Sequence, residues 1–137
     1  MTYKKYGVII DPNHPNPPNK RETEAADIVA KHFRTVIQFM VPINSYKTPT
    51  PDVAIFGRLI EIKTPEGKSR RLIDTQFRKA NKQLAEGIIL DGRYTKLEDK
   101  FLLKEISKNI LTWHRIRFVY FIDKNEKVFE ITKKTAR

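Results

Sequence analysis

The chain has 137 residues, of which 39% are hydrophobic and 31% charged, as in one soluble globular domain rather than a disordered or membrane-spanning chain. It contains no cysteine, which excludes disulfide bonds, zinc–thiolate sites and cysteine nucleophiles. Its 27 lysines and arginines against 16 acidic residues give a formal net charge of +11, and a domain this basic is expected to bind a polyanion, most commonly nucleic acid.

The sequence carries no signal for membrane insertion or secretion. No run approaches the roughly 18 consecutive apolar residues of a transmembrane helix, and the apolar N-terminal stretch is too short, and too soon followed by polar residues, for a signal peptide. We therefore expect a cytoplasmic protein with no membrane partner.

The N-terminal part predicts an arm, a helix and a strand. Residues 11–21 (DPNHPNPPNKR) are rich in proline and asparagine, so this segment is expected to be an ordered arm or a mobile loop, and residues 1–20 an N-terminal arm. Residues 21–35 (RETEAADIVAKHFRT) have helical periodicity, and residues 36–41 (VIQFMV) read as a β-branched and aromatic strand. The apolar stripe of this helix consists of Ala25, Ala26, Ile28, Val29 and Phe33.

The next segment predicts a β-hairpin turned at Gly57-Arg58, because glycine at the first central position suits a two-residue type II′ turn. This turn would pair Val53 with Ile62 and Ile55 with Ile60. A slip by one residue would move an apolar set to the solvent side, so burial of these four side chains favours this pairing.

The opposite face of the predicted hairpin carries three charges: Asp52 lies opposite Lys63 and diagonal to Glu61. One interpretation is an exposed cross-strand ion cluster, which would contribute little to stability. The other is a metal site, because two carboxylates suit a hard divalent cation that takes further ligands from water and phosphate. The spacing alone does not decide between them.

The C-terminal half predicts a second helix over residues 71–87, ended by Gly87, then a buried strand over 88–91 and a third helix over 97–111. Residues 115–123 and 127–132 predict a closing hairpin. The element order indicates a single α/β domain over residues 1–137, with a mixed central sheet flanked by helices. The apolar stripe of the second helix consists of Ile73, Phe77, Ala80 and Leu84.

The pair Pro51-Asp52 followed by Glu61-Ile62-Lys63 resembles the signature of the PD-(D/E)XK nuclease superfamily. The resemblance implies a restriction-endonuclease-like αβββαβ core, here over residues 21–91, with residues 92–137 adding a helix and a closing strand pair. It also implies a metal-dependent endonuclease that hydrolyses phosphodiester bonds of tRNA or DNA. Asp52, Glu61 and the Ile62 carbonyl would bind Mg²⁺ or Mn²⁺, and Lys63 would position the attacking water.

A third acidic ligand is often found on the first helix of that superfamily, where this chain offers Glu22 and Glu24. At about 100° per residue, Glu22 lies near the centre of the apolar stripe, whereas Glu24 points away from it. We therefore favour Glu22 as the third acid, with Glu24 as the alternative. The alternative is an acidic residue that favours the helix dipole, which accounts well for Glu24.

The second helix region is expected to bind the substrate, because basic residues gather there and phosphate contacts set affinity without reading sequence. Gln76 lies on the flank of the apolar stripe, near the side from which a substrate would approach. A solvated amphipathic face is the alternative for any one of these residues. The predicted substrate-binding residues are Lys68, Arg70, Arg71, Gln76 and Lys79.

Most of the chain also resembles the C-terminal nuclease domains of contact-dependent growth-inhibition toxins, through the basic helix, the segment EGIILD, a further helix and a closing strand pair. That resemblance implies an acidic immunity protein as a partner. Two alternatives stay open: a non-catalytic basic nucleic-acid-binding protein, and a metal-independent RNase toxin. The latter would need a histidine pair or a His–Glu pair, but His14, His32 and His114 are dispersed in the sequence.

Overall fold

The computed structural model describes residues 6–41 and 51–136, which form seven strands and three helices. In chain order the elements are β1 (Gly7–Ile9), α1 (Lys20–Phe33), β2 (Val36–Phe39), β3 (Val53–Ile55), β4 (Arg58–Lys63), α2 (Leu72–Lys82), β5 (Gly87–Asp91), α3 (Asp99–Thr112), β6 (Phe118–Ile122) and β7 (Val128–Thr132).

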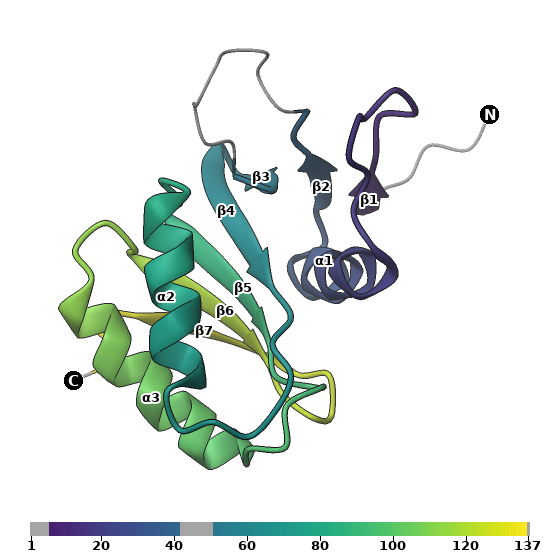
Figure 1. Cartoon of the computed structure of the whole chain (residues 1–137). Helices are drawn as coiled ribbons and strands as arrows, with labels where there is room; N and C mark the ends of the chain where they lie inside the picture. The colour runs from purple at the N-terminus through teal and green to yellow at the C-terminus, as the bar shows by residue number, and fades with distance from the viewer. Residues whose placement is uncertain (1–5, 42–50, 137) are drawn as a thin grey trace.

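The seven strands form one mixed sheet in which their spatial order follows their order in the chain. β1 and β2 are parallel, β3 runs antiparallel to both of its neighbours, β4, β5 and β6 are parallel, and β7 is antiparallel to β6. Helix α1 lies on one face of the sheet, and α2 and α3 lie on the other (Figure 1). The predicted α/β fold with a mixed sheet flanked by helices is therefore confirmed.

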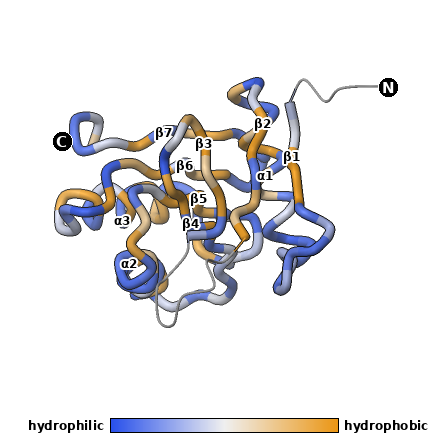
Figure 2. The backbone as a smooth tube through the Cα atoms, turned by 90° about the horizontal axis from the view of Figure 1, so that it is seen from above, coloured by the Kyte–Doolittle hydropathy of each residue, from blue (hydrophilic) through white to orange (hydrophobic). Residues whose placement is uncertain are grey.

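Two hydrophobic cores lie on the two faces of the sheet. One packs α1 against β2, β3, β4 and the inward residues of β5 and β6, and the other packs α2 and α3 against β5, β6 and β7. Figure 2 shows the hydrophobic residues gathered along the strands, with α2 largely hydrophilic in colour. All five residues of β5 and of β6 are buried, as expected for parallel strands covered on both faces. Within the described residues, every helix falls short of the length and apolarity that a membrane span requires.

Two local predictions are wrong. Residues 7–9 were expected to be part of an N-terminal arm but form the strand β1. This short apolar run pairs in parallel with β2, a strand far from it in the sequence. Helix α2 ends at Lys82, so Leu84 is not part of its stripe. Leu84 has a left-handed φ of 61° and is 42% exposed. Gly87, expected to stop the helix, instead begins β5.

Gly87 is required by packing rather than by backbone conformation. A Cβ built there would lie 2.3 Å from Cε2 and Cζ of the buried Phe118 ring. We expect Gly87→Ala to lower the free energy of unfolding by about 1–3 kcal/mol, as overpacking of a core does. Thermal and denaturant unfolding would measure this loss. If the Phe118 ring causes it, adding Phe118→Leu should make the cost of Gly87→Ala smaller, whereas strictly additive effects would contradict this explanation.

Candidate active site

The hairpin that carries the three charges has a different turn from the one predicted. The loop residues are Phe56 and Gly57, with φ values of 50° and 76°, and two positive φ values are the requirement of a type I′ turn. This turn follows the right-handed twist of the flanking strands. It pairs Val53 with Ile60 and Ile55 with Arg58. The predicted turn at Gly57-Arg58 and the predicted pairing of Val53 with Ile62 are therefore wrong.

The predicted register of the hairpin is wrong by two residues. Because side chains alternate between the two faces of a strand with a period of two, every side chain stays on its predicted face. The side chains predicted to enter the core are at most 4% exposed: Val53, Ile55, Ile60 and Ile62. What changes is the neighbour of Asp52. Continuing the observed register brings Asp52 beside Glu61 instead of opposite Lys63.

Each of the two carboxylates accepts a backbone N–H from the opposite strand segment. The backbone N–H of Asp52 donates to Glu61 Oε1 at 3.0 Å, and the N–H of Ile62 donates to Asp52 Oδ2 at 2.8 Å. The Asp52 carbonyl in turn accepts from the N–H of Met40, at the end of β2, at 2.8 Å. These backbone bonds fix the orientation of both side chains.

Burial makes this pair electrostatically unusual. Glu61 is only 5% exposed, and burial together with the charge of Asp52 raises its pKa to about 7, although Lys63 opposes the shift. Lys63 Nζ lies 3.2 Å from Glu61 Oε2. Burial also raises the pKa of Asp52, while its hydrogen bond from the Ile62 N–H acts in the opposite direction. Both carboxylates thus lack the solvation that would stabilise their charges, and a cation could supply it.

Glu22 lies at the same site, whereas Glu24 does not. Glu22 and Asp52 line one cavity of about 140 Å³, and the negative charge of Glu22 contributes to raising the pKa of Asp52. Glu22 Oε1 accepts from the Asn19 N–H at 3.0 Å, and the Asn19 side chain accepts from the Glu22 N–H at 2.8 Å, which is a capping box. Glu24 instead contacts Arg93 and Tyr94.

His14 also lines this cavity, and the sequence reasoning gave it no role. Its Nε2 lies 2.8 Å from the carbonyl oxygen of Met40, and its Nδ1 accepts from the Asn16 N–H at 3.1 Å. Both contacts together require the neutral ring with its hydrogen on Nε2. No spacing in the sequence could have revealed this position, because it depends on the residues after β1 folding back beside β2.

The predicted substrate-binding residues are distributed over two environments. Because Ile60 and Ile62 face α1, alternation directs Glu61 and Lys63 to the side of the sheet covered by α2. Gln76 is 8% exposed and lies among the buried residues of α2, so it is not a surface residue. The other four predicted residues are exposed: Lys68, Arg70 and Arg71 precede α2, and Lys79 lies on it, where Arg78 and Lys82 are exposed as well.

The donor set suits a cation that needs few protein ligands. Over residues 6–41 and 51–136, no three histidine, aspartate or glutamate side chains are grouped closely enough to hold a metal by themselves. The buried Glu61 and the half-buried Asp52 beside it nevertheless match Mg²⁺, which commonly binds one or two carboxylates and keeps several waters.

Residues 48–128 match the family model described as contact-dependent growth inhibition CdiA C-terminal domain. That segment includes Asp52, Glu61 and Lys63, whereas Glu22 lies outside it. The fold is similar to a chain of the CdiA-CT/CdiI toxin and immunity complex from Burkholderia pseudomallei, with a TM-score of 0.68 and 18% sequence identity over 92% of this chain and 99% of that chain. At this identity the likeness is one of fold. No curated protein matches the chain.

Proposed function

The chain belongs to the family of contact-dependent growth inhibition CdiA C-terminal domains, and from this premise we propose that it is a toxin domain that acts as a divalent-metal-dependent endonuclease of the PD-(D/E)XK type. The observation that carries the proposal is the interlocked pair of Asp52 and Glu61 with Lys63 beside it. For a nuclease of this type we would expect the mixed sheet of this chain to serve as a restriction-endonuclease-like core.

The electrostatics support a catalytic rather than a structural role for these residues. A surface ion cluster would leave its carboxylates hydrated, but Glu61 is 5% exposed and its pKa is raised to about 7. Perturbed pKa values that arise from burial and a specific charged neighbour are concentrated at functional sites. Ionised Glu61, buried beside Asp52, is also costly to the fold, which a structural role would not require.

The roles follow from the chemistry of the side chains. Asp52 and Glu61 would hold Mg²⁺ or Mn²⁺, helped by the Ile62 carbonyl and by Glu22. When bound, the cation would lower the pKa of a water molecule and neutralise charge on the phosphate. Lys63, already beside Glu61, would donate hydrogen bonds that orient the attacking water and stabilise the negative charge of the phosphate in the transition state.

The substrate would be tRNA or DNA. The net charge of +11 favours a polyanion, and the exposed basic residues around α2 lie on the side of the sheet to which Glu61 and Lys63 point. The solved structure similar in fold is a toxin and immunity complex. By analogy, an acidic immunity protein would be the protein partner, and its charge would complement that of this chain.

One observation favours a second candidate, a metal-independent RNase: His14 and Glu22 line the same cavity. A His–Glu pair can perform acid–base catalysis. Both ring nitrogens of His14 are, however, engaged with backbone groups, so neither is available to a substrate in this conformation.

A cleavage assay on plasmid DNA and total tRNA, each with Mg²⁺ and with excess EDTA, tests the proposal. We expect one substrate to be cut in Mg²⁺ and neither in EDTA. Cleavage of RNA in EDTA, leaving 2′,3′-cyclic phosphate ends, would support the metal-independent RNase instead. Nucleic acid that is shifted in a gel but remains uncut under every condition would make the chain a binding protein and overturn the nuclease assignment.

A further inference from the structure

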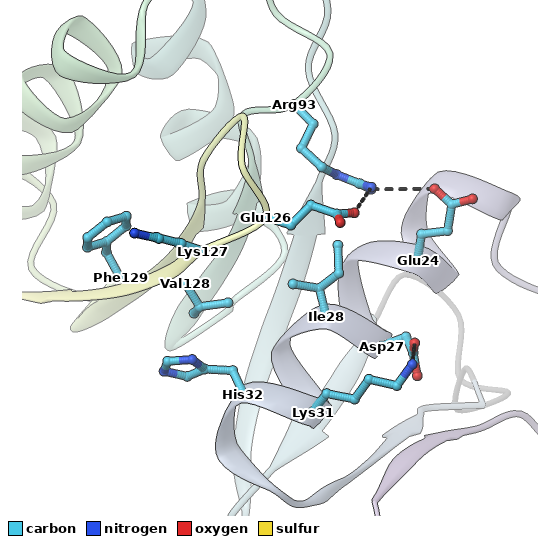
Figure 3. A pocket seen from close by; sticks show the side chains of 10 residues that line it. All are labelled: Glu24, Asp27, Ile28, Lys31, His32, Arg93, Glu126, Lys127, Val128 and Phe129. Atoms are coloured by element: carbon cyan, nitrogen blue, oxygen red, sulfur yellow. Dashed lines mark hydrogen bonds and ion pairs between the residues drawn. The ribbon is translucent and has the colours of Figure 1, made fainter.

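Arg93 joins three separate parts of the fold through charged contacts. It follows β5 and lies between α1 and the β6–β7 turn, at the edge of a cavity of about 860 Å³. Figure 3 shows its guanidinium reaching across this cavity towards Glu24 on α1 and Glu126 in the turn. These residues, together with Asp91 and Tyr94, are called the Arg93 clamp below.

Asp91 fixes the guanidinium in place. Arg93 Nε donates to Asp91 Oδ1 at 3.0 Å and Nη2 donates to Oδ2 at 2.9 Å, a paired contact in which the Asp91 side chain is fully buried. The backbone N–H of Arg93 also donates to Oδ1 at 3.0 Å. Two parallel bonds from one guanidinium to one carboxylate restrict its orientation as well as its position.

The remaining guanidinium nitrogens reach the two neighbouring elements. Nη2 lies 3.5 Å from Glu24 Oε2 on α1, and Nη1 donates to Glu126 Oε1 at 3.2 Å. The Tyr94 hydroxyl donates to the same Glu24 oxygen at 3.1 Å. Glu24 is therefore held by two donors from the segment that follows β5.

A second set of contacts secures the same turn of α1. The Arg21 guanidinium stacks on the Tyr94 ring at 3.9 Å from its centroid and pairs with Glu66 in the segment between β4 and α2. Residues 21 and 24 are thus both tied to the segments after β4 and β5, and Glu22 lies between them. The clamp and this stacking contact hold the helical turn that carries Glu22.

We propose that the Arg93 clamp is a positioning device for the metal site, which sets the distance between Glu22 on α1 and Asp52, just before β3, the two carboxylates that line one cavity. This inference rests on the proposed function. Glu22 and the Asp52–Glu61 pair belong to different layers of the fold, so their separation depends on how α1 lies against the sheet. A Mg²⁺ ion requires near-ideal octahedral geometry and keeps several waters, so a small displacement of a carboxylate that contacts the ion or its waters weakens binding.

The test measures Mn²⁺ binding by isothermal calorimetry, alongside the Mg²⁺ dependence of cleavage, for the wild-type chain and for Glu24→Gln. Glu24→Gln removes the carboxylate on α1 that the clamp holds, while leaving Asp91 paired with Arg93. We expect its affinity for Mn²⁺ to fall about 10-fold, as it does when an outer-shell partner is lost, with a much smaller change in the cleavage rate at saturating Mg²⁺. Arg93→Lys, which keeps the charge but loses the paired geometry, should show the same pattern.

Asp27→Asn is the matched control. It removes one carboxylate from the next turn of α1, at the same cavity, but one that pairs with Lys31 and not with the clamp. Its Mn²⁺ affinity should stay close to that of the wild type. Equal affinities of Glu24→Gln and wild type would overturn the clamp while leaving the nuclease intact. A wild-type chain that binds no Mn²⁺ would overturn the metal-dependent function and, with it, the clamp.

Discussion

Replacing Asp52 by asparagine, or Glu61 by glutamine, is expected to reduce Mg²⁺-dependent cleavage at least about 100-fold, because loss of a ligand should cost no less than loss of an outer-shell partner. Both substitutions remove a negative charge and preserve shape. The new amide oxygens can still accept from the Ile62 and Asp52 backbone N–H groups that the carboxylates now engage. The measurement is a single-turnover cleavage rate on the substrate identified in the plasmid and tRNA assay.

Binding separates a catalytic defect from a folding defect. In EDTA, a gel-shift titration with uncut substrate should show that both variants bind at least as well as the wild type, because each has lost a negative charge near the site. Glu130→Gln, a substitution of an exposed carboxylate on β7, provides the control and should cleave at the wild-type rate. Full activity in Asp52→Asn would show that the buried pair has no part in the chemistry.

Much of this site could be predicted because it depends on local periodicity. Strand alternation placed Asp52, Glu61 and Lys63 on one face, and this survived a wrong register because the error was an even number of residues. Helical periodicity placed Glu22 on the apolar side of α1, where it lines a cavity with Asp52. The register itself could not be predicted, since the turn requires Phe56, a non-glycine residue, at a positive φ.

The parts that escaped prediction depend on contacts between distant segments. Strand β1 has only three residues, too few for a recognisable period, and gains its hydrogen bonds from β2. His14 reaches Met40 across 26 residues of sequence. In the Arg93 clamp, Asp91 is a neighbour in sequence, but Glu24 and Glu126 are brought to it by the tertiary fold. Charges that pair over such separations leave no signal in a single sequence.

The stability of the metal-free chain is expected to fall as the pH rises from about 4.5 through about 7, relative to Glu61→Gln. Burial and the neighbouring Asp52 raise the pKa of Glu61 from 4.5 to about 7, so the folded chain holds this proton more tightly than the unfolded chain does. The neutral carboxyl therefore stabilises the fold below pH 4.5, and this stabilisation is lost as the proton leaves. The full difference would be on the order of 3 kcal/mol.

Thermal unfolding of both proteins in EDTA, from pH 4 to pH 8, would measure this effect. Glutamine has the shape of the protonated glutamate but does not titrate, so the two proteins should have similar melting temperatures at pH 4. Glu61→Gln should then become the more stable of the two by several degrees near pH 8. Parallel profiles across the whole range would mean that Glu61 is solvated well enough to ionise freely, contrary to its 5% exposure.

Adding Mg²⁺ at pH 8 tests whether the stability lost when Glu61 ionises is linked to the proposed metal binding. A cation that binds the ionised pair supplies the solvation that burial removed, and it stabilises only the folded chain, by about 2.7 kcal/mol at 100 times its dissociation constant. The wild type should therefore regain stability in Mg²⁺, and Glu61→Gln should gain little. Because the metal competes with the proton on Glu61, the gain should also shrink as the pH falls below 7. A pH-independent gain, shared equally by both proteins, would locate the bound cation elsewhere on the molecule.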